Sequence, residues 1–546
     1  MRRTIILIFC FLMLLGFSSC RREATNNGKK VFNMNLDQSL TSLDPAFSRN
    51  QNAMWMVNQV FNGLVQIDSN LNILPCIAKT WQTAPDGLTY TFNLRNDVYF
   101  HADPLFKNTD AGKGRKVVAS DFTYSFYRLI DPKVASSGGW IFSDKVKDIN
   151  SFKAINDTTF QIVLSKPIPA FLNMLTTQYC SVVPKEVVEH YGKDFRSHPI
   201  GTGPFKFKYW KEDEILVLLK NEHYWEKVDG QQLPYLDAVK VTFISDKQSA
   251  FMNFIKKELD FFDKVDGSYR DDILTKSGKM TSKYKGKFVL RKRPYLCTEY
   301  VGIMVDTNAA ITKNSPLKYK KVRQAINYAI DKPKLIKYLR NGVGIPATSG
   351  FIPQGMPGFD SAAVKGYHYN PRKAAALLAE AGFPNGKGMP QLTLSTSTTY
   401  KDLIEFVQGE LNELGIKVKV DVSHSASLRD LISKNEVNFF RGSWIADYPD
   451  GENYLAMFYS KNKVPTGPNY TAYYNDEFDR LFEKSFYISD PEARFKLYQQ
   501  MDSMIMEHGN MVPIFYDQSV TMTQNNITGY AINPQNLMIL KTVRKQ

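Results

Sequence analysis

AKTWQTAPDGLTYTFNLRNDV, residues 78–98, is the stretch that best indicates the fold. Within it, Tyr90, Phe92 and Leu94 alternate with polar residues, which is the period of a strand with one buried face. Strand patterns also occur at residues 31–36 and 416–422, and patterns typical of helices lie between them. Because strands and helices mix along the whole chain, the sequence predicts an α/β fold.

Several predicted helices have clear start and stop signals. Asn370 and Asp490 each precede a proline, and Gly382 and Gly509 follow the last apolar turn of the same helices. A polar cap followed by proline at the start and glycine at the end is typical of helix termini. The sequence therefore predicts helix N-caps at Asn370, Asp490, Asn475 and Ser120.

The N-terminus follows the pattern of a secretory signal. Arg2 and Arg3 precede an apolar run over residues 5–17, which is shorter than the roughly 20 apolar residues that span a bilayer. Residues 1–19 are therefore predicted to be a signal peptide that is removed from the mature protein.

The segment Gly-Phe-Ser-Ser before Cys20 resembles the lipobox of bacterial lipoproteins, with Phe17 where relatives usually have Leu. The resemblance implies a lipid anchor on Cys20, followed by a polar, flexible tether over residues 20–30. The alternative is an ordinary signal in which Cys20 is coincidental. With the anchor, the protein would be held at a membrane of the cell envelope and face the periplasm or the cell exterior.

The charge and the cysteine content argue against several classes of function. The net charge of +15 falls to +13 without Arg2 and Arg3, and the basic residues form no single stripe that would indicate a nucleic-acid module. We interpret the lysines as a solvated face near an anionic membrane. Mature cysteines besides Cys20 are Cys76, Cys180 and Cys297, so one disulfide can form and none is required. The absence of a Cys-x-x-Cys pair and of paired histidines gives no support for a metal, a redox site or another cofactor.

Six blocks in order resemble one family. After residues 78–98 they are Ser120-Asp121 with Tyr124-Ser125, Gly201-Thr202-Gly203-Pro204-Phe205, Asn221 with Tyr224-Trp225, Val322-Arg323-Gln324-Ala325 with Ala329 and Asp331, and Leu377-Leu378 with Ala381-Gly382. The chain resembles the bacterial extracellular solute-binding proteins of family 5, the oligopeptide, dipeptide and nickel class. The chain departs from the pattern of this family by an extra stretch over residues 104–115.

The resemblance implies a type II periplasmic-binding-protein clamp, in which two jaws and an extra lobe make three lobes. Lobe I would comprise residues 31–72, 197–298 and 514–546. Lobe II would comprise residues 73–196, and lobe III, the opposing jaw, residues 299–513. The two later crossings between jaws fall near residues 297–300 and 512–515, and we expect a monomer.

The segment Phe439 to Tyr454, FFRGSWIADYPDGENY, is the candidate site. An apolar strand runs into a loop that concentrates Arg441, Trp444, Asp447 and Tyr448, and loops on rigid scaffolds often carry binding residues. An apolar wall, an anchor for a cation and a clamp for a carboxylate are what a zwitterionic peptide needs.

The same segment resembles the stretch in which peptide-binding relatives pair a Trp-x-x-Asp carboxylate with the ligand's α-amino group. The resemblance assigns Asp447 to that amino group, Trp444 to the cleft wall and Arg441 to the carboxylate of short ligands. The alternatives are that Asp447 caps a turn, that Trp444 belongs to the core and that Arg441 pairs with Asp450.

These observations predict the substrate-binding component of an ABC importer that captures short peptides and delivers them to permease and ATPase subunits. The sequence has no HExxH motif, no Gly-x-Ser-x-Gly motif and no Ser-x-x-Lys motif accompanied by its usual partner motifs. We therefore name no catalytic residue and predict no enzyme. Alternatives with the same fold bind a nickel chelate, haem or a sugar, or bind peptides as a sensor or chaperone. An exported enzyme is the remaining class.

Overall fold

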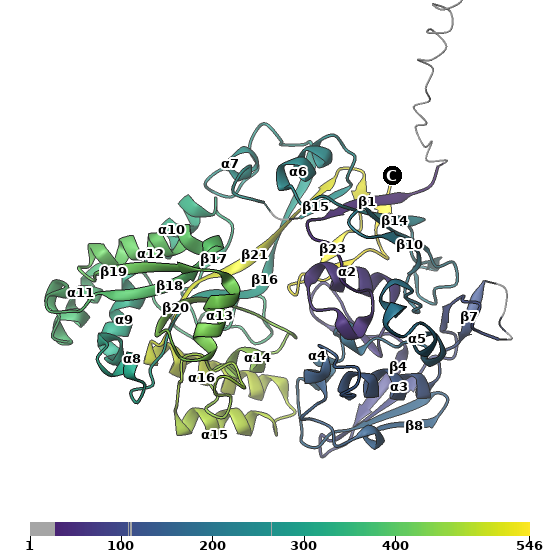
Figure 1. The fold of residues 1–546 in the computed structure, drawn as a ribbon, viewed down its shortest axis with the longest axis horizontal. Coiled ribbons are helices and arrows are strands. Elements are labelled where there is room, and N and C mark those ends of the chain that lie inside the picture. Colours follow the sequence, from purple (N-terminus) through teal and green to yellow (C-terminus); the bar gives the residue numbers. More distant parts are fainter. Residues whose placement is uncertain (1–27, 108, 110–111, 264) are drawn as a thin grey trace, which may run out of the picture.

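The computed structural model describes residues 28–107, 109, 112–263 and 265–546. The predicted signal peptide, Cys20 and residues 20–27 of the predicted tether lie outside the described residues. Figure 1 shows two bodies joined by the long strands β16 (Phe288–Ile303) and β21 (Met511–Gln524). We call the residues before β16 and after β21 the first jaw, and the residues between these strands the second jaw. Both jaws combine sheets with helices, as the sequence predicts.

One sheet of the first jaw contains the strand predicted at residues 31–36. Its order is β1-β14-β11-β10, with bounds Val31–Leu36, Ala238–Phe243, Ile215–Lys220 and Phe205–Lys211. β1 and β14 run parallel, with Val31 opposite Ala238 and Leu36 opposite Phe243. Helix α2 (Gln51–Val60) buries Trp55, Met56 and Val57 in the same core.

The second sheet of the first jaw is built from the stretch 78–98. Its order is β4-β5-β9-β8, with bounds Ala78–Thr83, Thr89–Leu94, Thr159–Val163 and Phe152–Asn156. Tyr90, Phe92 and Leu94 are all buried, which confirms the predicted alternation. Between β4 and β5 the chain turns at Gly87, whose φ of +71° favours glycine.

Helix α3 (Ala119–Ile130) covers this sheet and corrects one prediction. Its N-cap residue is Val118, not Ser120. The helix begins at Ala119, so Ser120 already lies in its first turn. The Asp121 carboxylate in the same turn accepts a hydrogen bond of 2.9 Å from the Val118 amide.

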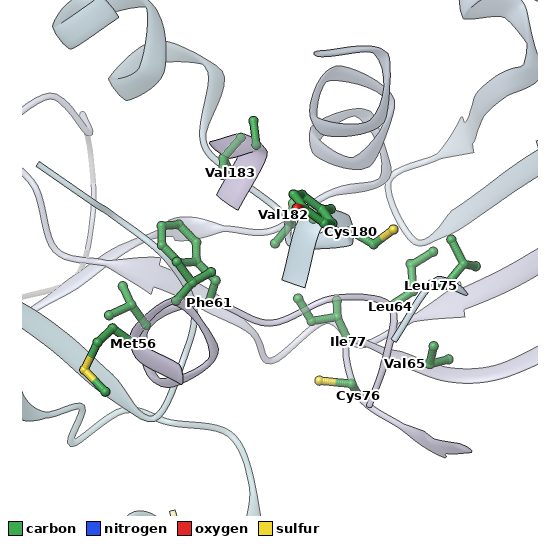
Figure 2. Packing of buried hydrophobic residues seen from close by; sticks show 14 of the residues in the cluster. Met56, Phe61, Leu64, Val65, Cys76, Ile77, Leu175, Cys180, Val182 and Val183 are labelled. Atoms are coloured by element: carbon green, nitrogen blue, oxygen red, sulfur yellow. The ribbon is translucent and has the colours of Figure 1, made fainter. Parts of the chain in front are cut away.

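Aromatic and aliphatic side chains from both sheets merge into one core in the first jaw. Figure 2 shows part of it, where Phe61, Leu64, Ile77 and Val182 pack around two cysteines. Cys76 and Cys180 are buried free thiols, as is Cys297 on β16. Burial raises the pKa of Cys76 and of Cys180 to about 12, so these thiols stay protonated and inert.

The second jaw is built on a sheet that continues across both connecting strands. Its order is β15-β21-β16-β20-β18-β19, and β17 also pairs with β21. The bounds besides β16 and β21 are β15 Phe261–Asp263, β17 Ile345–Pro346, β18 Leu392–Ser397, β19 Val418–Ser423 and β20 Phe439–Ile445. β19 begins later than the predicted strand, because the Ile416 amide still bonds to Leu411 O at the end of the preceding helix.

Helices surround this sheet and begin largely where the sequence predicts. Asn370, Asn475 and Asp490 each accept a hydrogen bond from the amide three residues later, which confirms these N-caps. The longer helices are α9 Lys320–Ala329, α10 Lys332–Leu339, α11 Pro371–Glu380, α12 Lys401–Glu413, α13 Ser425–Ser433, α15 Asp476–Ser485 and α16 Pro491–His508. Gly509 ends α16 with a φ of +74°.

Apart from α6, which has nine residues, the remaining elements are short. The helices are α4 Phe171–Met174, α5 Lys185–Tyr191, α6 Lys247–Ile255, α7 Arg270–Ile273, α8 Ala310–Lys313 and α14 Glu452–Leu455. The strands are β2 Val65–Ile67, β3 Ile73–Pro75, β6 Tyr99–His101, β7 Lys113–Lys116, β12 Lys227–Val228, β13 Gln231–Gln232, β22 Ile527–Thr528, β23 Ala531–Ile532, β24 Met538–Ile539 and β25 Arg544–Lys545. Among the described residues, no helix is long and apolar enough to cross a membrane.

The pairing of β16 with β21 is irregular where the chain passes between the jaws. The register shifts between Pro294 and Thr298, and again between Glu299 and Tyr300. Such irregularities bend a strand pair locally. They lie beside residues 297–300 and 512–515, and the division into three lobes, with its limits there and elsewhere, stays a prediction.

Candidate functional site

The candidate loop follows β20 and is fixed against the crossing. β20 lies between β16 and β18, with Trp444 opposite Thr298. After the strand ends, the Ala446 amide donates to Leu296 O at 2.9 Å, and the Tyr454 hydroxyl donates to the same oxygen at 2.8 Å. The loop that carries Asp447 is therefore held on a rigid strand pair.

Asp447 has an exposed side chain and makes no ion pair with any described residue. Asn453 Nδ2 donates to its Oδ2 at 3.4 Å. Surrounding protein displaces water and raises the pKa of the Asp447 carboxyl, while the hydrogen bond from Asn453 opposes the shift. A carboxylate that is reachable from solvent but poorly hydrated is suited to meet a cationic group of a ligand.

Asn453 joins Trp444 to Asp447 and is a residue that the sequence reasoning missed. Its Oδ1 accepts hydrogen bonds from Trp444 Nε1 at 3.0 Å and from the Asp447 amide at 3.3 Å. Trp444 is half-buried and packs partly against the core of the second jaw. It therefore combines a core contact with a partly exposed surface beside Asp447.

Arg441 is paired within the protein. Its guanidinium contacts both carboxylate oxygens of Glu299, with Nη2 to Oε2 at 2.6 Å, and lies over the Tyr400 ring at 3.1 Å from the centroid. Desolvation opposes its charge, but Glu299 outweighs that effect and raises the pKa of Arg441. Asp450, the alternative partner that the sequence suggested for Arg441, instead pairs with Arg494, with 3.5 Å between Asp450 Oδ2 and Arg494 Nη2. Arg441 therefore lies near the site, and Glu299 already neutralises its charge.

Tyr448 forms a contact between the jaws. Its ring stacks on Trp140 of the first jaw, with centroids 6.0 Å apart and an interplanar angle of 21°. Its hydroxyl is hydrogen-bonded to Glu452, and Gln535 of the first jaw donates to Asp447 O at 3.3 Å. The side chain is 5% exposed, so this arrangement leaves little of Tyr448 for a ligand.

Tyr179 of the first jaw lies within electrostatic range of Asp447, whose backbone oxygen accepts the hydrogen bond from Gln535 of the same jaw. Burial raises the pKa of the Tyr179 hydroxyl, Ser137 opposes the shift through a hydrogen bond, and the Asp447 carboxylate adds to the rise. Asp447 therefore lies between the jaws, where a ligand would be enclosed.

A cavity of about 350 Å³ lies beside the crossing and receives residues from both jaws. Its lining includes Gln51, Tyr295, Arg340, Tyr400, Asp517 and Asn536. Arg340 and Asp517 form an ion pair of 2.5 Å. Two other hollows, of about 280 and 1590 Å³, lie entirely in the first jaw and do not meet the second. The predicted site residues Arg441, Trp444, Asp447 and Tyr448 are not among its lining residues, although Tyr400, which Arg441 covers, is. A further hollow of about 570 Å³ also takes its lining from both jaws.

The last residues of the stretch 104–115 do not approach this region. They belong to β7, which Figure 1 places at the outer edge of the first jaw, away from β20. Arg115 there pairs with Asp121 at 2.7 Å and with Glu186. In the part of the chain that the structure describes, no cluster of His, Cys, Asp and Glu is arranged to hold a metal ion.

Comparison with known proteins agrees with this architecture. The model of the bacterial extracellular solute-binding proteins, family 5, matches residues 72–466. The chain belongs to this family. Members share the type II clamp, and the match covers most of both jaws.

Relatives align over almost the full length. The glutathione-binding protein GsiB of Escherichia coli K12 is 26% identical over 529 residues, 96% of each chain. DppA of Helicobacter pylori, solved with the peptide STSA, is 26% identical with a TM-score of 0.74, over 96% of this chain and 100% of that one. HbpA2 of Haemophilus parasuis has the same fold, with a TM-score of 0.81 and 24% identity over 94% of this chain and 100% of that one.

Proposed function

We propose that this family 5 protein is the substrate-binding component of an ABC importer for short peptides. The observation that carries the proposal is Asp447, a carboxylate without an ion pair among the described residues, held between the jaws. The peptide complex of DppA and the glutathione-binding role named for GsiB support peptides as the ligand class.

The charged groups near the crossing between the jaws favour a ligand with a cationic end. Arg441 is neutralised by Glu299 and Arg340 by Asp517, so these four groups add little net charge. Asp447 keeps a negative charge that no described side chain matches. The α-ammonium of a peptide meets this need, and it is present on every unmodified peptide whatever its side chains. A neutral sugar would leave the carboxylate unpaired.

Ligand capture and delivery follow from the two-jaw arrangement. We propose that the jaws close about the irregular pairing of β16 and β21, between Pro294 and Tyr300. The three-lobe division with boundaries at residues 72, 196, 298 and 513 belongs to the same proposal. Permease and ATPase subunits would receive the ligand, and the protein itself would carry out no catalysis.

The location also belongs to the proposal. Membership in an extracellular solute-binding family and the signal pattern at residues 1–19 support export. Acyl chains on Cys20 would then hold the protein, acting as a monomer, at the outer side of a membrane.

Mass spectrometry of ligands released by denaturing the purified protein tests the ligand class. The proposal expects a mixture of short peptides with free amino termini. Recovery of a single nickel chelate, haem or sugar would contradict it.

A further inference from the structure

A strongly basic segment lies at the hinge side of the first jaw. Residues 276–293, KSGKMTSKYKGKFVLRKR, contain eight Lys and Arg residues and no Asp or Glu. Six of the eight side chains are exposed: Lys276, Lys279, Lys283, Lys285, Lys287 and Arg293. This segment is therefore one place where exposed basic side chains follow one another closely along the chain.

These side chains point outward because two buried aromatic residues anchor the segment in the core. Tyr284 and Phe288 are buried in a cluster with Phe251 and Phe254. The Tyr284 ring lies 5.9 Å from Phe251 and 5.6 Å from Phe288. With Tyr284 pointing inward, its neighbours Lys283 and Lys285 both point to solvent.

Part of this charge has no counterion. Lys276 pairs with Asp271 at 2.8 Å, and Lys283 pairs with Asp272 at 2.7 Å. Lys279, Lys285, Lys287 and Arg293 make no ion pair with any residue that the structure describes. An exposed apolar side chain, Val289 at 36%, lies among them. Unpaired basic groups around an apolar residue fit an anionic interface with an apolar layer behind it.

The segment lies close to the point where the described chain begins. Lys29 and Lys30 are exposed there, and the Asn33 amide donates to Asp260 Oδ2 at 2.8 Å. The next residue, Phe261, pairs with Thr523, which pairs with Val289. Two strand spacings, about 10 Å, therefore separate Phe261 from the basic segment. Figure 1 shows α6, α7 and the start of β1 on the same upper side.

We propose that Lys279, Lys285, Lys287 and Arg293, together with Lys29 and Lys30, form a surface that binds the anionic headgroups of phospholipids. The inference rests on the proposed envelope location and is independent of the ligand in the cleft. The nine residues from Cys20 to Lys29 reach at most about 32 Å, so a lipid on Cys20 would bring this surface to the bilayer. The acyl chains would hold the protein at the bilayer, and the basic surface would add electrostatic attraction to anionic lipids and fix the orientation of the protein.

The orientation that results keeps the cleft accessible. Figure 1 shows α4 and α14, which flank the contact between the jaws, on the opposite side from α6 and α7. With the basic surface on the bilayer, the ends of the jaws that meet at Trp140 and Tyr448 would face away from the membrane, and the proposed opening of the jaws would admit ligand from there. The surface would thus orient the protein on the membrane for ligand binding.

Vesicle sedimentation with matched variants tests the proposal. All proteins carry Cys20→Ala, so that acyl chains do not dominate binding and the N-terminus is identical throughout. The test variant is K279Q/K285Q/K287Q/R293Q. The control is K387Q/K417Q/K419Q/K463Q, which removes the same charge from exposed lysines of the second jaw that make no ion pair with a described residue.

The probes are vesicles of phosphatidylcholine with phosphatidylglycerol and vesicles of phosphatidylcholine alone. Each basic residue near an anionic surface contributes about fivefold to affinity, so the test variant should bind mixed vesicles at least about tenfold more weakly. The control variant should lose about twofold or less, and raised salt should abolish the difference. Equal losses in both variants, or equal binding to both vesicle types, would overturn the proposal. Peptide binding should be unchanged in both variants, so the result does not depend on the proposed ligand.

Discussion

The ion pair between Arg441 and Glu299 yields a prediction about stability. The change is Glu299→Gln, which keeps the shape of the side chain and removes its charge. Glu299 is 5% exposed and Arg441 11%, so the variant leaves a buried guanidinium without its counterion. Removing one member of a buried pair typically costs about 3 to 5 kcal/mol. Because the amide oxygen still accepts one hydrogen bond and Tyr400 still covers the guanidinium, we expect about 3 kcal/mol.

Urea unfolding followed by circular dichroism measures this loss as a fall in the midpoint at an unchanged slope. The matched control is Glu483→Gln, whose partner Lys461 is 71% exposed, and it should change the unfolding free energy far less. A loss below about 1 kcal/mol in Glu299→Gln would refute the reasoning that this pair is a buried structural element.

The same variant tests the role predicted for Arg441 in ligand binding. In the wild type its charge is matched by Glu299, so amidating the carboxyl terminus of a peptide should change little through Arg441. In Glu299→Gln the guanidinium lacks an anion, and a peptide with a free carboxylate should gain affinity over its amide. Calorimetry with both peptides measures the difference, and an identical ratio in both proteins would exclude Arg441 from the ligand's carboxylate.

Three further predictions concern pH, anchoring and motion. Burial raises the pKa of Asp502 to about 7, so the folded state binds a proton more tightly than the unfolded state. The free energy of unfolding should therefore fall as the pH rises from about 4 to about 7. Urea titrations of Asp502→Asn should show a flatter dependence of that free energy on pH, and an unchanged dependence would contradict this prediction. Cys20→Ala should abolish acylation while the body still folds, so a variant that still carries acyl chains by mass spectrometry would refute the anchor. Saturating peptide should reduce the radius of gyration in X-ray scattering as the jaws close, and superimposable curves would count against the hinge at β16 and β21.

Local features of the fold could be predicted from the sequence because their causes are local. The caps at Asn370, Asn475 and Asp490 follow from a polar side chain next to the first helical turn, and they are observed. Ser120 failed because the helix begins one residue earlier, at Ala119, so Ser120 already lies in the first turn. A polar residue near the start of a helix does not by itself reveal where the first helical turn begins.

The candidate segment 439–454 could be proposed from the sequence, but the partners of its residues within the protein could not. Glu299, the partner of Arg441, is 142 residues away in the chain, and nothing in the segment 439–454 points to it. Trp140 meets Tyr448 only because the jaws face one another. Asn453 lies within the quoted segment, yet its bridging role depends on the turn that brings it back to Trp444. Contacts between distant segments follow from the topology of β16 and β20, which no local pattern encodes.

The most direct test of the proposed function combines Asp447→Asn with N-acetylation of a peptide ligand in isothermal calorimetry. Losing one member of a desolvated charge pair costs about 2 to 5 kcal/mol, so either change alone should weaken binding at least roughly thirtyfold. The two losses should not add, because both remove the same interaction. The control Asp157→Asn, an exposed carboxylate of the first jaw, should leave affinity unchanged. Equal binding of acetylated and free peptides to the wild type would contradict Asp447 as the anchor of the amino terminus.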